Sequence, residues 1–189
     1  MPATDDTTPS TGGRRISART LALLGVVAVL VYLLDQGAKV LVLKELEVNE
    51  TRPFLGELLQ LHLVKNPGAA FSLGSGSTWI FAIIASAVVV VIILFSTRIR
   101  STGWAFVFGL LLGGTLGNLS DRLFREPGFG VGHVVDFLQL YAFPAIFNIA
   151  DIGITSAMVL FVLLTIRVIN LDGTRSVREK KPVEADTPQ

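Results

Sequence analysis

Residues 76–97 have the sequence GSTWIFAIIASAVVVVIILFST, an apolar run without a charged side chain. About 20 such residues form a helix long enough to cross the ~30 Å hydrocarbon core of a bilayer. Three further apolar segments lie on either side of this run, at residues 20–43, 103–123 and 145–168. The pattern predicts an all-α integral membrane protein with four transmembrane helices.

The composition agrees with a membrane protein and argues against several other classes. Of the 189 residues, 51% are hydrophobic, and the mean hydropathy is +0.62, far above that of a soluble domain of this size. A net charge of +1 gives no reason to expect nucleic acid as a partner. Without cysteine, with two histidines and without the usual metal-binding spacings, the chain implies no metal or other cofactor.

The basic residues indicate the orientation of the four helices. Ten of them fall on one face of the predicted bundle: Arg14, Arg15, Arg19, Arg98, Arg100, Arg167, Arg175, Arg178, Lys180 and Lys181. The positive-inside rule places this face, and with it both termini, in the cytoplasm. Residues 44–75 and 124–144 then form two outer segments. Alternating residues at 58–64 suggest a short strand, so a small extracytoplasmic β-containing segment is expected between the first two helices.

The two ends of the chain differ in composition from the part between them. Residues 1–13 are rich in Thr, Asp, Pro and Gly, and residues 172–189 carry mixed charges, so both are predicted to be disordered cytoplasmic tails. Residues 14–171 form the predicted membrane domain. The first apolar segment could also be a cleavable secretory signal, but no small-residue cleavage site follows it, which favours a retained helix.

Carboxylates occur inside three of the predicted helices at similar depths. Counted from the cytoplasmic charges at ~1.5 Å per residue, Asp35, Asp121 and Asp151 all fall in the outer part of the membrane. Ionisable groups at membrane depth cost several kcal/mol each and are usually retained for a function. Three carboxylates at one level therefore predict a site near the outer surface.

Polar stripes on two helices support this interpretation. Asn118, Asp121 and Arg122 are spaced i, i+3, i+4, and Asn148 and Asp151 are spaced i, i+3, so each group shares one helical face. Interhelical hydrogen bonds or an interfacial arginine would explain a single stripe. Two stripes at equal depth favour a functional site.

Other motifs have both a structural and a functional interpretation. Asp35 and Lys39 are spaced i, i+4, as in a simple intrahelical ion pair. The segment Asn66-Pro67-Gly68-Ala69-Ala70-Phe71 is either a turn before the second helix or a place where an extended peptide approaches the backbone. The pair Gly113 and Gly117 predicts close helix packing.

The chain also has an acidic block outside the predicted helices, Val134-Val135-Asp136-Phe137. Its apolar sequence neighbours favour the protonated form of Asp136, whereas the adjacent Arg122 favours the ionised form of Asp121. Two close carboxylates with different protonation states are suited to general acid–base catalysis.

In their order along the chain, these blocks resemble the lipoprotein signal peptidases (signal peptidase II), the membrane aspartic peptidases of bacteria. The likeness extends over about residues 20–170. It rests on Asp35-Gln36 with Lys39, Asn66-Pro67-Gly68-Ala69-Ala70-Phe71, Gly113-Gly114-Thr115-Leu116-Gly117-Asn118-Leu119-Ser120-Asp121-Arg122, Val134-Val135-Asp136-Phe137 and Phe147-Asn148-Ile149-Ala150-Asp151.

The resemblance implies cleavage of diacylglyceryl-modified prolipoproteins N-terminal to the lipidated cysteine by two aspartates, without metal. Asp136 and Asp151 correspond to that catalytic pair. The residues expected to bind substrate or support the pair are Asp35, Lys39, Asn66, Gly114, Asn118, Asp121, Arg122, Asn148 and Ala150. The resemblance also implies a multi-pass protein of the bacterial cytoplasmic (inner) membrane, an active site near the extracytoplasmic side, contact with membrane lipids, and binding of globomycin-type inhibitors.

Two other classes of function compete with this interpretation. A proton-coupled transporter or channel would also place acidic residues inside a helical bundle. It would need a polar path through both leaflets, whereas the inner halves of the second and fourth helices are almost entirely aliphatic. A non-enzymatic scaffold is the third class. Within the peptidase interpretation, residues 137–146 are hypothesised to gate substrate entry, since they are rich in Leu, Phe and Tyr.

Overall fold

The computed structural model describes residues 17–68 and 77–174. Within these residues, four helices are long and apolar enough to cross a membrane, as predicted: α1 (Ala18–Glu45), α2 (Thr78–Ser96), α3 (Thr102–Phe124) and α4 (Ile149–Ile166). The predicted tail at residues 1–13 and most of the tail at 172–189 lie outside the described residues.

Residues 170–174 form a turn against the start of α3, where the carbonyl oxygen of Leu171 accepts hydrogen bonds from the backbone N–H groups of Arg100 and Ser101.

The predicted helix bounds are close to the observed ones except at the start of α4. The sequence predicts a helix from residue 145, but α4 begins at Ile149 because Asn148 caps it. The Asn148 side chain accepts a hydrogen bond from the backbone of Asp151, and the Asp151 side chain accepts one from the backbone of Asn148. This reciprocal capping box fixes the first turn of the helix. Residues 146–147 belong instead to a strand.

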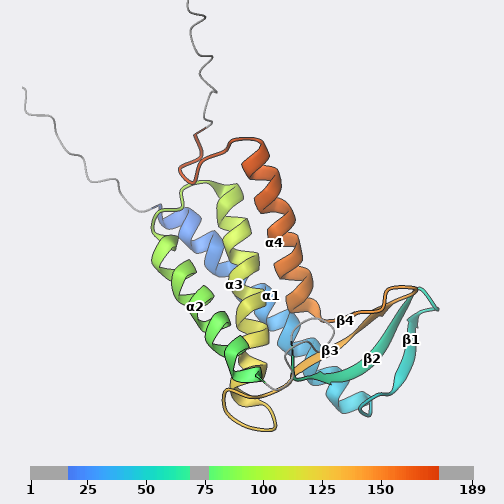
Figure 1. The fold of residues 1–189 in the computed structure, drawn as a ribbon. Coiled ribbons are helices and arrows are strands. Elements are labelled where there is room, and N and C mark those ends of the chain that lie inside the picture. Colours follow the sequence, from blue (N-terminus) through green and yellow to red (C-terminus); the bar gives the residue numbers. More distant parts are fainter. Residues whose placement is uncertain (1–16, 69–76, 175–189) are drawn as a thin grey trace, which may run out of the picture.

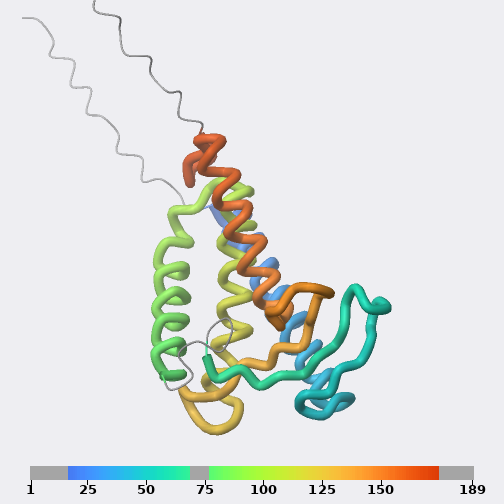
Figure 2. The backbone as a smooth tube through the Cα atoms, turned by 45° about the vertical axis from the view of Figure 1, so that its right-hand side comes forward, coloured from blue at the N-terminus to red at the C-terminus, as the bar shows by residue number. Residues whose placement is uncertain are grey.

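A four-stranded antiparallel sheet lies at one end of the bundle, in the order β1 (Thr51–Leu55), β2 (Leu59–Asn66), β3 (Val134–Leu140) and β4 (Ile146–Phe147). Figures 1 and 2 show the sheet at the end opposite the two ends of the described chain. The strand predicted at 58–64 corresponds to β2. The segment 124–144, for which no strand was predicted, contains β3, and β3 carries Asp136.

The pairing of β2 with β3 determines which side chains share a face. Asn66 pairs with Val134, Lys65 with Val135, and Val64 with Asp136, with a register shift between Leu61 and Val64. Successive side chains of a strand point to opposite faces of a sheet. The side chains of Asn66 and Asp136 are therefore on one face, and those of Lys65 and Val135 are on the other.

Helix α3 is the central helix of the bundle and packs against the other three (Figure 1). Glycines allow the close approach predicted for this segment. A Cβ at Gly113 would lie 2.5 Å from the carbonyl oxygen of Ala28 in α1, and one at Gly114 would lie 2.5 Å from that of Ala150 in α4. Helix α3 therefore packs closely against both α1 and α4.

Candidate active site

A cavity of about 500 Å³ lies between α2, α3, α4 and the sheet. The residues that line it come from all of these elements and include Asn66, Gly68, Phe81, Thr115, Asn118, Arg122, Asp136, Phe143, Phe147, Asp151 and Thr155. Both aspartates of the predicted pair face this cavity, one from β3 and one from the first turn of α4. The predicted convergence of polar groups is thus present, although Asp136 reaches the site from a strand.

Asp136 lies in a nearly closed environment, with 4% of its surface exposed. Its Oδ1 accepts a hydrogen bond from Nδ2 of Asn148 at 2.6 Å, and its Oδ2 accepts one from Nδ2 of Asn66 at 2.8 Å. Burial, together with the charge of Asp151, raises the pKa of Asp136 to about 7, against the lowering effects of the two amides and of Lys39. Asp136 therefore keeps its proton at pH values where ordinary carboxyl groups have lost theirs.

Asp151 is held by donors from two elements. Its Oδ1 accepts a hydrogen bond from Nδ2 of Asn118 at 2.8 Å, and its Oδ2 accepts one from the backbone N–H of Asn148 at 3.1 Å. The residue occupies the first turn of α4, where the helix dipole favours a negative charge. Asn148 thus contacts both aspartates, Asp136 with its side chain and Asp151 with its backbone.

Lys39 orients the amide of Asn118. Its Nζ donates to Oδ1 of Asn118 at 3.1 Å, and Nδ2 of Asn148 donates to the same oxygen, also at 3.1 Å. With its oxygen engaged by two donors, the Asn118 amide turns its N–H group toward Asp151. Lys39 is therefore connected to Asp151 through Asn118, although it contacts neither Asp136 nor Asp151.

Lys39 also joins two buried carboxylates. Its Nζ lies 2.7 Å from Asp35 and 2.7 Å from Asp121, and all three side chains are 0% exposed. Asp35 accepts the backbone N–H of Ala150 at 2.9 Å, next to Asp151. Asp121 accepts the backbone N–H of Val135 at 3.2 Å, next to Asp136. The ion-paired group thus ties the start of α4 and the start of β3 to the same lysine.

The ion-pair partners of Asp121 are residues other than its sequence neighbour. Arg122 makes no ion pair with Asp121; instead Asp121 pairs with Lys39 and with Arg125, whose Nε lies 2.5 Å from Oδ1. Neighbouring residues on a helix point in different directions, whereas residues at i and i+4 share a face. The i, i+4 spacing of Asp121 and Arg125 is visible in the sequence and could have identified this pair.

Arg122 points into the cavity instead. Its Nη2 donates to the carbonyl oxygen of Gly68 at 2.6 Å, and its guanidinium carbon lies 5.1 Å from the ring centre of Phe81. Its Nη1 is buried and has no hydrogen-bond partner in the part of the chain that the structure describes. An unsatisfied buried donor is costly. Arg122 therefore lines the cavity and carries one buried donor that the described residues leave unused.

Of the remaining predicted residues, some line the cavity and others lie behind its wall. Asn66 lines it and also accepts the backbone N–H of Gly68 at 2.9 Å, as in the predicted turn; residues 69–71 of that motif lie outside the described residues. Gly114 and Ala150 form the close contact between α3 and α4. Asp35, Lys39 and Asp121 lie behind the cavity wall and do not line it.

Sequence reasoning missed three contributors to the site. Gln36 donates from Nε2 to Asp35 and to the carbonyl oxygen of Gly117, which connects α1 to α3. Phe81 brings α2 to the cavity beneath Arg122, and Arg125 completes the ion-paired group. Gln36 lies within a quoted motif, but the apolar sequence of α2 contains no signal for Phe81. No group of three His, Cys, Asp or Glu side chains suited to a metal ion occurs within residues 17–68 and 77–174.

Comparisons with known proteins agree on one family. The family model described as signal peptidase (SPase) II matches residues 27–167. The lipoprotein signal peptidase of Leifsonia xyli is 57% identical over 174 residues, which cover 92% of this chain and 81% of that protein. The lipoprotein signal peptidase of Streptomyces coelicolor is 46% identical over 156 residues, which cover 82% and 76%. A solved structure of a bacterial membrane enzyme matches with a TM-score of 0.71 and 25% identity, covering 87% of this chain and 98% of that one.

Proposed function

This chain belongs to the signal peptidase II family, whose curated relatives are lipoprotein signal peptidases, and we propose that it cleaves diacylglyceryl-modified prolipoproteins N-terminal to the lipidated cysteine. The observation that carries the proposal is the pair of aspartates facing one cavity, with Asn148 hydrogen-bonded to both. The substrate peptide enters this cavity, and its lipid anchor holds the scissile bond near the membrane surface, which lowers the orientation cost of the reaction.

The two aspartates have different roles in the proposed mechanism. Asp151, with two donors to its carboxylate and a helix N-terminus beside it, takes a proton from water as the water oxygen bonds to the scissile carbonyl carbon. Asp136, which is protonated up to about pH 7, gives its proton to the leaving nitrogen as the carbon–nitrogen bond breaks. Exchange of a proton between the carboxyl groups and water restores the starting state.

Arg122 is the proposed substrate-binding cation. Arg122 lines the same cavity as the aspartates, and its guanidinium, whose Nη1 has no partner among the described residues, is suited to donate to a peptide carbonyl oxygen once substrate displaces the groups that cover it. The ring of Phe81 below the guanidinium and the carbonyl oxygen of Gly68 hold the side chain in place. Residues 137–146, of which Phe143, Ala145 and Ile146 line the cavity, are the proposed gate; deleting part of this segment without a change in activity would exclude that role.

The proposed setting is the bacterial cytoplasmic membrane, with both termini in the cytoplasm and the cavity near the extracytoplasmic side. Residues 14–171 act as the membrane domain between two cytoplasmic tails. The basic residues at the end of the bundle opposite the sheet support this orientation. Membrane lipids surround the apolar outer faces of the helices, and globomycin-type inhibitors are expected to occupy the catalytic cavity.

The test is cleavage of a diacylglyceryl-modified prolipoprotein in reconstituted membranes. Asp136→Asn and Asp151→Asn should each lower the rate at least about 100-fold, the usual contribution of an acid or base. Glu57→Gln neutralises an exposed carboxylate in the turn between β1 and β2 and should leave the rate unchanged. Near-normal cleavage by either aspartate variant would show that Asp136 and Asp151 are not the catalytic pair. If the wild type left the substrate uncut while the Leifsonia xyli relative cleaved it in the same membranes, the proposed function would fail.

A further inference from the structure

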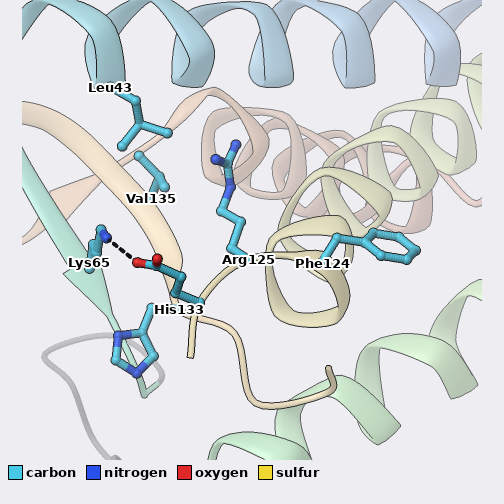
Figure 3. Close-up of a pocket in the computed structure, with 7 residues that line it drawn as sticks. Leu43, Lys65, Phe124, Arg125, His133 and Val135 are labelled. Carbon is cyan, nitrogen blue, oxygen red and sulfur yellow. Dashed lines mark hydrogen bonds and ion pairs between the residues drawn. The ribbon is translucent and has the colours of Figure 1, made fainter. Parts of the chain in front are cut away.

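A second cavity, of about 300 Å³, lies on the reverse face of the strand pair that carries the catalytic residues (Figure 3). Asn66 and Asp136 face the catalytic cavity, whereas their chain neighbours Lys65 and Val135 pair with each other and line the second one. Its lining residues are Leu43, Lys65, Phe124, Arg125, Glu126, His133 and Val135. The proposed peptidase mechanism makes no use of this second cavity.

The second cavity gathers basic side chains from three separate segments: Lys65 from β2, Arg125 after α3 and His133 before β3. Arg125 uses Nε for Asp121 and Nη2 for Gln36. Figure 3 shows the side chains of Arg125 and His133 turned in opposite directions, with Lys65 between them. Lys65 is therefore the cation that an anion in this cavity would contact.

One acidic side chain, Glu126, also lines this cavity. Its carboxylate lies 3.0 Å from Nζ of Lys65, and 86% of its side-chain surface is exposed. Exposed ion pairs of this kind contribute little stability, because both groups are well solvated when apart. An incoming anion can displace Glu126 from Lys65 at small cost.

The cavity lies at the boundary of the membrane-spanning helices. Leu43 is in the last turn of α1, and Phe124 is the last residue of α3. Phe124 and Phe129 are 77% and 79% exposed, and their ring centres lie 6.4 Å apart in an edge-to-face contact. An exposed pair of apolar rings at the end of a membrane-spanning helix is suited to contact with a membrane. The basic residues lie beside the ends of α1 and α3, so in the proposed orientation they are near the membrane surface, with apolar side chains beside them.

We propose that this cavity binds the headgroup of an anionic phospholipid of the outer leaflet. Nζ of Lys65 donates a charge-assisted hydrogen bond to the phosphate, and the positive charge of Arg125 adds to the attraction. The acyl chains lie along Leu43 and Phe124, on the membrane side of the cavity. Clusters of basic residues next to membrane-spanning helices are a recognised source of affinity for anionic lipids.

The test is lipid binding to the purified full chain, measured by native mass spectrometry with phosphatidylglycerol and phosphatidylcholine. Wild type should prefer phosphatidylglycerol, and Lys65→Gln should weaken its binding by about 10-fold, as expected for one charge-assisted hydrogen bond. Glu126→Gln removes the competing anion and should strengthen binding. Arg52→Gln, which removes an exposed positive charge from β1 on the same sheet, is the matched control and should change nothing.

Each outcome decides the proposal. Preferential binding of phosphatidylglycerol that is lost in Lys65→Gln and increased in Glu126→Gln supports it. Equal binding of both lipids, or equal effects of Lys65→Gln and Arg52→Gln, overturns it. Inorganic phosphate is the third probe, since it has the same oxygens without acyl chains: if it binds as tightly as phosphatidylglycerol, the cavity is a phosphate site and the lipid assignment is wrong. None of these readouts depends on peptidase activity, so they are independent of the proposed function.

Discussion

The side-chain amide of Asn148 donates to Oδ1 of Asp136 over 2.6 Å. Because Asn148 also caps α4 and gives its backbone N–H to Asp151, this one residue sets the position of both carboxyl groups of the proposed dyad. The structural role and the catalytic role of Asn148 are separable, since they use different atoms. The cap uses the side-chain oxygen, whereas the contact with Asp136 uses the side-chain nitrogen.

Substitution of Asn148 can therefore distinguish the two roles. Asn148→Ser retains a good helix cap but has no amide to reach Asp136, so cleavage should fall while stability, reduced by the lost buried hydrogen bonds, stays above that of Asn148→Ala. Asn148→Ala loses the cap as well and should be less stable by about 1 kcal/mol. Thermal unfolding in detergent and the cleavage rate are the two measurements. Full activity in Asn148→Ser would show that the contact with Asp136 is dispensable.

The pH dependence of cleavage should report the state of Asp136. With its pKa raised to about 7 by burial, Asp136 loses its proton as the pH rises through that value, so kcat/KM should fall on the alkaline side near pH 7. Asn66 donates to Asp136 and favours its ionised form, so Asn66→Ala should raise this pKa and move the alkaline limb to higher pH.

The control for the pH experiment is Gln139→Ala. Gln139 is on β3 with Asp136 but bonds to His62, away from the dyad, so its loss should leave the alkaline limb in place. A limb that moves to lower pH in Asn66→Ala would contradict the assignment of Asp136 as the proton donor.

The contribution of the buried Lys39 to stability can be tested with a second substitution that restores the charge balance. Lys39→Met leaves Asp35 without a cationic partner in the ion-paired group and should lower the free energy of unfolding by about 3–5 kcal/mol, as for other broken buried pairs. The double variant Lys39→Met, Asp35→Asn removes the uncompensated charge, while Asp121 keeps Arg125. It should be more stable than Lys39→Met alone. Additive losses in the double-mutant cycle would argue against a shared ion pair.

The contact between α3 and α4 has a sharp steric test. Gly114→Ala places a methyl group 2.5 Å from the carbonyl oxygen of Ala150, so α4 must move, and overpacking of this kind costs about 1–3 kcal/mol. Cleavage should fall too, since Asp151 moves with the helix. Gly25→Ala in α1 has nothing within 4 Å of the new carbon and should be neutral. Equal melting temperatures for the two variants would show that the close approach is not required.

Arg122 has a matched control at the other end of the bundle. The guanidinium of Arg98 lies over Phe95 at 5.1 Å, the same distance as that of Arg122 over Phe81, but Arg98 is far from the cavity. Lysine in place of Arg122 keeps the charge and loses Nη1, so kcat/KM should fall by about 10-fold. Arg98→Lys should leave cleavage unchanged. If both variants cleaved equally well, Arg122 would have no role in substrate binding.

The helices and the level of the polar groups could be predicted from the sequence because both depend on local quantities. Apolar length gives the spans, and a fixed rise per residue placed Asp35, Asp121 and Asp151 at one depth. The structure brings Asp35 and Asp121 together on Lys39, with Asp151 one residue beyond a backbone contact of Asp35. Equal depth along the helices predicted that these side chains would be close together, and the prediction held because the helices pack closely around α3.

The strand that carries Asp136 could not be predicted in the same way. Residues 134–137 are all buried, so β3 lacks the alternation of apolar and polar residues that identifies a strand with one exposed face. Its partner, β2, is separated from it by two helices in the sequence. The pairing of Lys39 with both Asp35 and Asp121 is equally non-local, and only the intrahelical half of it is visible as an i, i+4 spacing.

The register of β2 against β3 has a consequence for preparing the protein. Because neighbouring side chains alternate between faces, a slip of one residue would bring Lys65 into the catalytic cavity and turn Asn66 away from Asp136. The irregularity between Leu61 and Val64 opposes such a slip. A molecule with the shifted pairing would still be full-length, helical and inserted in the bilayer. Measurements of yield and of circular dichroism would not distinguish such a molecule from active enzyme. The active fraction of a preparation is therefore measured only by titration with a tight-binding inhibitor.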